Sequence, residues 1–72
     1  MRVTYDAGVD AAYIYLAAEV RAGGVARTVP VDPRETDGMI NLDFDAEGRL
    51  VGIEVLDASR FLSPDLLALA EP

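Results

Sequence analysis

The chain lacks cysteine, histidine and lysine altogether. Without cysteine it has no disulfide and no cysteine-based metal site to stabilise a small fold. Without histidine it lacks the commonest general base and metal ligand of proteins. Six arginines face thirteen acidic residues, which gives a net charge of −7. That balance argues against nucleic acid and against anionic membranes as partners, because binding either one requires cationic side chains.

A long apolar run is also missing. No stretch approaches the roughly 20 apolar residues that span a bilayer, and residues 1–6 do not have the pattern of a signal peptide. We therefore expect a cytoplasmic protein. Its 72 residues predict a single domain, 1–72, which at this size buries only about 60% of its unfolded surface. Self-association is the remaining simple source of extra stability, so we expect a homodimer.

The clearest pattern is a β-hairpin in residues 38–59. Apolar and polar residues alternate along 40–45, a short turn follows at 46–48, and the alternation returns along 51–55. This period of two is typical of paired antiparallel strands with one buried face. The six apolar residues of that face are Ile40, Leu42, Phe44, Val51, Ile53 and Val55.

Two registers of this hairpin are open. A four-residue turn, 45–48, places Ile40 opposite Ile53 and keeps all six apolar residues on one face. A three-residue turn with a bulge at Gly48 shifts the pairing by one residue and sets Glu54 beside Ile40. Because burying an unpaired carboxylate is costly, we favour the four-residue turn.

Three more strands precede the hairpin, at residues 2–5, 11–17 and 25–31. The segment 11–17 is rich in alanine and would also suit a helix, but its Tyr-Ile-Tyr run favours a strand. Pro30 has no N–H, so the third strand is expected either to lie at an edge of the sheet or to end at this residue. Residues 32–38 are predicted to be the longest loop and the most mobile one.

Helical signals are confined to the end of the chain. Asp57 is placed to cap a first helical turn. Ser63 is a good N-cap for a helix that begins at Pro64. Leu62 and Leu67 are spaced for a hydrophobic staple. The elements predict an α+β fold: a small, mostly antiparallel β-meander of about five strands with a C-terminal helix packed on one face.

Two tyrosines are the candidate interface residues. A single helix covers one face of the sheet, and Tyr13 and Tyr15 then lie on the other. A second copy of the chain could bury them there in a homodimer. Alternatively, they half-cover a wet face, with each hydroxyl in water.

The hairpin turn contains a calcium-like pattern. Residues 43–54 fit D-x-D-x-E-G-x5-E, one conservative change from the EF-hand loop. An EF-hand needs a helix that enters the loop, whereas residues 40–45 alternate like a strand. We keep Asp43, Asp45 and Glu47 only as candidates for a looser divalent-cation site. The competing interpretation is an acidic turn in which Asp45 bonds backbone N–H groups.

No catalytic residue and no cofactor is predicted. Ser59 and Ser63 have no histidine to activate them, and helix capping explains both. The acidic cluster 32–37 could offer a carboxylate pair, but so short a chain has little room for a substrate cleft. We therefore expect no enzymatic activity.

Three motifs of the chain resemble a known family. They are Tyr5-Asp6; Asp10-Ala11 followed by Tyr13-Ile14 and Leu16; and Asp43-Phe44-Asp45 followed by Gly48-Arg49-Leu50-Val51-Gly52-Ile53-Glu54-Val55-Leu56-Asp57-Ala58-Ser59. In them the chain resembles the small prokaryotic proteins of the domain-of-unknown-function family numbered 2283, from its first residue to about residue 61. That resemblance assigns no catalytic residue. It implies an antitoxin-like role, because some members are encoded next to small toxin-like proteins.

We predict from these observations a small acidic, non-enzymatic protein-binding module that self-associates. In its antitoxin-like form the acidic surface would mask a basic protein partner. The alternative is a divalent-cation-binding module at the hairpin turn, Asp43 to Gly48.

Overall fold

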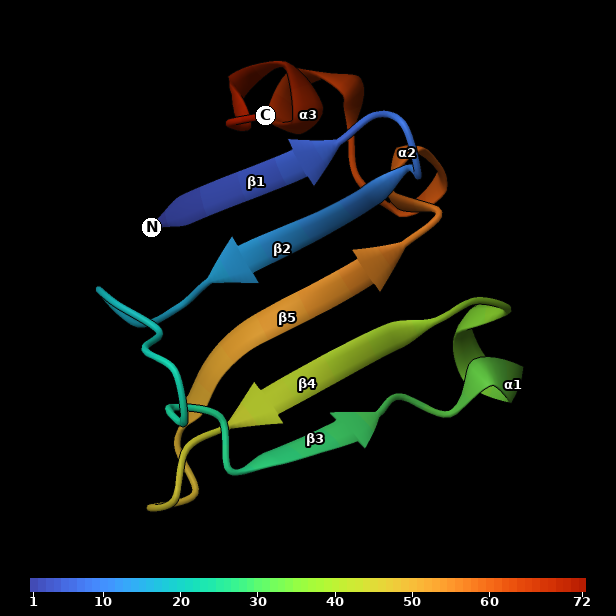
Figure 1. Ribbon diagram of the computed structural model, residues 1–72. Helices are drawn as coiled ribbons and strands as arrows, with labels where there is room; N and C mark the ends of the chain where they lie inside the picture. Colours follow the sequence, from blue (N-terminus) through green and yellow to red (C-terminus); the bar gives the residue numbers. More distant parts are fainter.

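The computed structural model describes all 72 residues and shows a five-stranded sheet with three short helices (Figure 1). The strands are β1 (Arg2–Asp6), β2 (Ala11–Tyr15), β3 (Arg27–Pro30), β4 (Ile40–Phe44) and β5 (Leu50–Leu56). The helices are α1 (Pro33–Thr36), α2 (Ala58–Phe61) and α3 (Pro64–Leu69). The predicted α+β class is confirmed. A bilayer-spanning helix needs about 20 residues, and none of the three helices could serve as one.

The strand order is β1-β2-β5-β4-β3, and every neighbouring pair is antiparallel. A simple meander would place β3 beside β2. Instead the chain crosses from β2 to the far edge, and β5 returns into the middle (Figure 1). β5 suits the middle because Val51, Gly52 and Val55 are buried. β3 suits the edge, as predicted, because Arg27 and Pro30 are exposed and a proline cannot donate to a further strand.

The predicted register of the β4–β5 hairpin is wrong. Ile40 lies opposite Val55, not opposite Ile53, and Leu42 lies opposite Ile53. The shift is two residues, so each side chain keeps the face that was expected of it. The apolar positions of both strands therefore still point to one side of the sheet.

The turn explains this shift. The Asp45 N–H donates to the Arg49 carbonyl at 2.9 Å, and Gly48 has a φ of 82°. The hairpin therefore has the three-residue turn. The register that this turn sets would, without a further irregularity, place Glu54 on the apolar face. A bulge then leaves Val51 without an opposite residue and restores the alternation.

The hydrophobic core is small and lies under one part of the sheet. Its centre is formed by Ala12, Val55 and Ala58, which are at most 3% exposed. Half-buried side chains of the strands and of the two C-terminal helices pack against it: Tyr5, Ile40, Ile53, Phe61, Leu62 and Leu67. Leu62 and Leu67 both belong to this set, and their direct contact in a hydrophobic staple stays a prediction.

The C-terminal segment covers the edge of β1. Ser63 caps α3, as predicted, by accepting the Leu66 N–H at 3.2 Å. After α3 the chain runs beside β1 (Figure 1). There the Tyr5 N–H donates to the Glu71 carbonyl at 2.7 Å, and the Glu71 N–H donates to the Val3 carbonyl at 2.9 Å. An edge that is covered in this way is not free to pair with another chain.

Residues 32–38 contain α1 and are not the plain loop that the sequence predicts. Asp32 accepts the Arg34 N–H at 2.9 Å, and Pro33 occupies the first helical position. Asp37 ends the turn with a φ of 54°, in the left-handed region that aspartate tolerates better than most residues. Four residues of helix with a cap at each end replace the expected loop.

Candidate functional site

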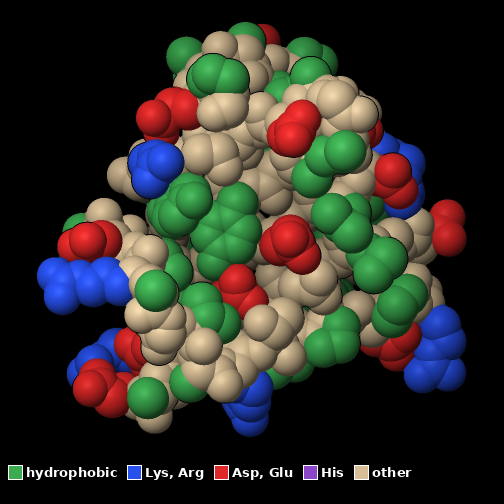
Figure 2. All heavy atoms as spheres, in the orientation of Figure 1, with side chains coloured by type: hydrophobic (Ala, Val, Ile, Leu, Met, Phe, Trp, Pro, Cys, Tyr) green, Lys and Arg blue, Asp and Glu red, His purple; other side chains and the backbone are tan.

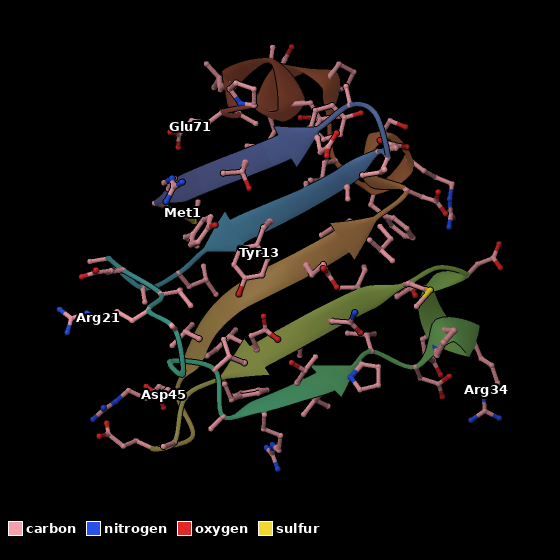
Figure 3. All side chains as sticks on the ribbon, in the orientation of Figure 1. Met1, Tyr13, Arg21, Arg34, Asp45 and Glu71 are labelled. Atoms are coloured by element: carbon pink, nitrogen blue, oxygen red, sulfur yellow. The ribbon has the colours of Figure 1, made fainter.

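The polar face of the sheet is organised around Tyr13 of β2. Its ring crosses the neighbouring strand β5 at Gly52, where a Cβ atom would lie 2.0 Å from the tyrosine hydroxyl oxygen. Only a glycine leaves room for this crossing. The hydroxyl reaches β4 and donates a hydrogen bond of 2.7 Å to Asp43 Oδ2. Figure 3 shows Tyr13 lying across the front of the sheet.

Asp43 receives a second hydroxyl from the other side. Thr28, on the edge strand β3, donates from its Oγ1 to Asp43 Oδ1 at 2.6 Å. The carboxylate thus accepts one hydrogen bond on each oxygen, both from neutral donors. Through these contacts Tyr13 and Thr28 join β2, β4 and β3 above the central strand.

The surroundings of Tyr13 keep its hydroxyl neutral. Burial, the hydrogen bond to Asp43 and the negative charge of Asp43 raise the pKa of Tyr13 far above its ordinary value of 10.0. The neighbouring Tyr15 and Glu54 act in the same direction. A raised pKa means that the associated stability is complete below the unfolded-state value and is lost as the pH rises through the folded-state value. At neutral pH the hydroxyl therefore keeps its proton and donates it to Asp43.

Glu54 is the second carboxylate of this face. It lies in β5 opposite both Tyr13 and Asn41, and its Oε1 accepts the Asn41 side-chain amide at 2.9 Å. The ion pairs of the structure involve other acids, namely Glu71, Glu19, Asp32 and Glu47. Asp43 and Glu54 are therefore held by neutral donors, and no arginine of the chain pairs with either.

Tyr15 completes the face at the β1 end. Its ring meets the Tyr13 ring edge-on, with ring centres 4.7 Å apart, and the Arg2 guanidinium carbon lies 4.5 Å from the Tyr15 ring centre. We name the surface made by Tyr13, Tyr15, Asp43 and Glu54 the tyrosine–carboxylate face. In Figure 2 acidic side chains lie beside hydrophobic ones near its middle. This face points away from the hydrophobic core. That Tyr13 and Tyr15 take part in an interface stays a prediction.

A second network joins the two ends of the chain and was not foreseen from the sequence. The Asp10 carboxylate accepts three hydrogen bonds: from the Tyr5 hydroxyl at 2.7 Å, the Ser59 N–H at 3.0 Å and the Ser59 hydroxyl at 2.7 Å. The Asp10 carbonyl also accepts the Ala58 N–H at 2.9 Å. Asp10 therefore caps α2 from a position 49 residues away in sequence.

The predicted cap of α2 is wrong. Asp57 stands at the N-cap position, but its φ is 52° and its side chain makes no capping hydrogen bond. The left-handed backbone turns this side chain away from the helix end. The turn between β1 and β2 instead brings Asp10 to the N–H of Ser59.

The family comparison covers both networks. A family described as "Protein of unknown function (DUF2283)" matches residues 2–59, most of the chain. The chain belongs to the DUF2283 family. The resemblance seen in the sequence motifs is thereby confirmed. The DUF2283 match includes Tyr5, Asp10 and Ser59 and ends before α3. No curated protein and no solved structure matches the chain.

In this DUF2283 chain the three acidic candidates for a cation site are not brought together. Asp43 already binds two hydroxyls. Asp45 Oδ1 accepts the N–H groups of Glu47 and Arg49, each at 2.9 Å, and the Glu47 side chain pairs with that of Arg49. No three Asp, Glu, His or Cys side chains of the chain converge as metal ligands do. The acidic-turn interpretation describes this hairpin.

Asp10 links the stability of the DUF2283 fold to pH. Hydrogen bonds from Ser59 and Tyr5 hold the pKa of Asp10 below its ordinary value of 3.8. A lowered pKa contributes stability above the unfolded-state value, and that contribution is lost as the pH falls through the folded-state value. We expect Asp10→Asn to be less stable than the unmodified chain at neutral pH and to lose less of its stability in acid.

Urea unfolding at a series of pH values measures both effects. Asp57→Asn is the matched control, because it removes the same charge at the same helix end from a side chain without a capping bond. We expect the control to keep the stability and the acid dependence of the unmodified chain. Identical curves for the two variants would contradict the assignment of Asp10 as the cap.

Proposed function

We propose that this DUF2283 protein is a small non-enzymatic binding module that holds a basic segment of another protein on its tyrosine–carboxylate face. The proposal rests on how the carboxylates of Asp43 and Glu54 are held. Both are half-buried on the sheet, both are fixed by neutral donors, and neither is in an ion pair. Their charge is therefore left for a cationic partner.

Tyr13 and Tyr15 add apolar contact area beside these carboxylates. Tyrosine is enriched where protein interfaces are most deeply buried. Both side chains are already held in place: the Tyr13 hydroxyl bonds Asp43, and the Tyr15 ring packs against the Arg2 guanidinium. Binding a partner would therefore cost little additional side-chain entropy. The guanidinium of a partner arginine would donate hydrogen bonds to one of these carboxylates and stack its plane on a tyrosine ring.

The charge of the whole chain supports the same class of partner. Only four of the thirteen acidic side chains are in ion pairs with arginine. A net charge of −7 speeds the approach of a basic protein and disfavours an acidic one. The form of this role that we favour is antitoxin-like, with the module masking a basic toxin in the cytoplasm.

The use of the polar groups supports binding over catalysis. Every buried side-chain nitrogen and oxygen has a hydrogen-bond partner. The Ser59 hydroxyl donates to Asp10 at the start of α2, and the hydroxyls of Tyr13 and Thr28 donate to Asp43. Hydroxyls used in this way hold the fold and its surface in shape, whereas a nucleophile needs a base that activates it.

Co-expression with the protein encoded by the adjacent gene, followed by co-purification and calorimetry, tests this role. We expect a stable complex whose affinity falls about tenfold in Glu54→Gln, because that variant removes a charge from the contact and keeps the shape of the side chain. Glu35→Gln is the matched control: it removes the same charge from α1, outside the tyrosine–carboxylate face. The affinity of the control should be nearly unchanged. The proposal fails if no complex forms and if the chain does not rescue growth from the adjacent gene product.

A further inference from the structure

We propose that two copies of this chain pack together through the part of the apolar face that the helices leave uncovered. The surface is one row of side chains across all five strands, which we name the open row. It consists of Val3, Ile14, Ile53, Leu42 and Val29, which the registers place opposite one another in turn. All of them are half-buried and none is charged. Self-association through this row does not depend on the proposed partner of the opposite face.

The helices of the chain cover the neighbouring row instead. The side chains packed at the core include Tyr5, Ala12, Val55 and Ile40, which form that row. Of the open row, only Ile53 belongs to the side chains packed against the core. A sheet buries an apolar face by packing it against a second layer. The other four side chains of the open row are not among those that pack against the core, and each stays partly exposed.

The exposed area supports a second copy as the missing layer. The chain exposes 4947 Å², whereas a monomeric globular protein of its mass, 7.7 kDa, exposes about 4300 Å². The excess of about 600 Å² is close to what each partner buries in the smaller stable interfaces. The shape agrees with this reasoning, because the Cα extents of 33 × 29 × 18 Å describe a flat slab with wide faces.

The two faces of the sheet differ in charge, and this difference favours the open row as the contact between two copies. In a two-fold dimer each residue near the axis lies beside its own copy. On the tyrosine–carboxylate face, Asp43 and Glu54 would meet the same carboxylates of the partner, and like charges in contact are unfavourable. The open row has no charge, so two chains of net charge −7 meet there without this penalty. The expected dimer thereby moves from Tyr13 and Tyr15 to the opposite face of the sheet.

The packing is of one sheet on another. β5 is the central strand, so Ile53 is the middle residue of the open row and lies nearest the two-fold axis. Facing sheets are spaced about 10 Å apart, a distance that side chains of this size fill from both sides. Each copy would then present its tyrosine–carboxylate face outward. A dimer of this kind leaves two faces free for basic partners.

Sedimentation tests the proposal directly. We expect the unmodified chain to sediment at about twice its mass of 7.7 kDa. Val29→Arg, at the edge-strand end of the open row, should sediment as a monomer with an unchanged circular dichroism spectrum. Leu69→Arg is the matched control, because Leu69 is already 83% exposed on α3, and it should keep the dimer. Glu54→Gln should keep the dimer too, so that loss of partner binding and loss of self-association are separate results.

A labelling experiment covers the case in which a charged substitution unfolds the chain. The protein has no cysteine, so a single Leu42→Cys replacement gives one thiol in the open row. We expect its reaction with a maleimide to slow as the protein concentration rises, while the thiol of Leu69→Cys reacts at a constant rate. A monomer at every concentration would overturn the proposal, and so would equal labelling of both variants. Loss of the dimer in Tyr15→Asp but not in Val29→Arg would assign the contact to the other face.

Discussion

Gly52→Ala is expected to lower the free energy of unfolding by about 2–3 kcal/mol, the sum of a local overpacking cost and of one lost side-chain hydrogen bond. The new Cβ atom would lie 2.0 Å from the Tyr13 hydroxyl oxygen and 2.4 Å from the ring carbon that carries it. Neither contact can be relieved by a small shift. The Tyr13 ring must leave β5, and its hydrogen bond to Asp43 is lost with it.

Two variants show whether Tyr13 is the cause. Gly8→Ala is the matched control, because the nearest heavy atom to its Cβ would be Asp6 Oδ1 at 3.2 Å, in an exposed turn. In a chain that already carries Tyr13→Ala, the Gly52→Ala change should cost little, since the space above the strand is then empty. A double-mutant cycle measured by urea unfolding gives this interaction energy. Equal costs of Gly52→Ala in both backgrounds would rule out the crossing of Tyr13.

The titration of Tyr13 gives an independent measurement of the same displacement. Its pKa is raised chiefly by burial and by the hydrogen bond to Asp43, and both causes disappear when the ring swings away. The pKa in Gly52→Ala should therefore fall towards the ordinary value of 10.0. Ultraviolet absorbance of the phenolate follows this change at alkaline pH. The tyrosine–carboxylate face would lose its central contact, so partner binding should weaken as well.

The period of two in the sequence predicted which side chains share a face, but it could not predict the register. Alternation is preserved by any even shift, so it does not distinguish Ile53 from Val55 as the partner of Ile40. The rejected three-residue turn is the one that forms, and the bulge at Val51 corrects its consequence for Glu54. A bulge is compatible with many sequences, because it only requires one residue to go unpaired.

The sites depend on contacts that no local pattern reports. Gly52 has no role in the sequence pattern that would mark it, because its contact with Tyr13 exists only if β2 and β5 are neighbours. Asp10 and Ser59 lie in different motifs, and their hydrogen bonds require the closed fold. The sequence predicts a hydrogen bond correctly where both partners lie within one helix turn, as in the capping of α3 by Ser63. The sequence therefore predicts elements and faces more readily than it predicts a site that several strands assemble.

Val55→Ala is the second large effect that we expect, with a loss of about 2–3 kcal/mol from two buried carbon atoms and the cavity they leave. Val55 is 3% exposed and lies in the central strand between Ala12 and Ile40. Its core neighbours Ala12 and Ala58 are too small to fill the space by changing rotamer. A domain of this size has about 4–11 kcal/mol of stability in all, so a cavity of two methyl groups removes a large share of it.

Thermal unfolding at a fixed protein concentration measures this loss, since self-association would add to the apparent stability. The midpoint should fall by about 10–20 °C, from the usual shift of about 4–8 °C per kcal/mol in domains of this length. Val9→Ala is the matched control: it removes the same two carbons from a side chain that is 70% exposed, and its midpoint should stay within about 2 °C of the unmodified chain. If the two variants unfold together, Val55 is not at the centre of the core. If only Val55→Ala is destabilised, a core of three small residues holds the sheet and α2 together.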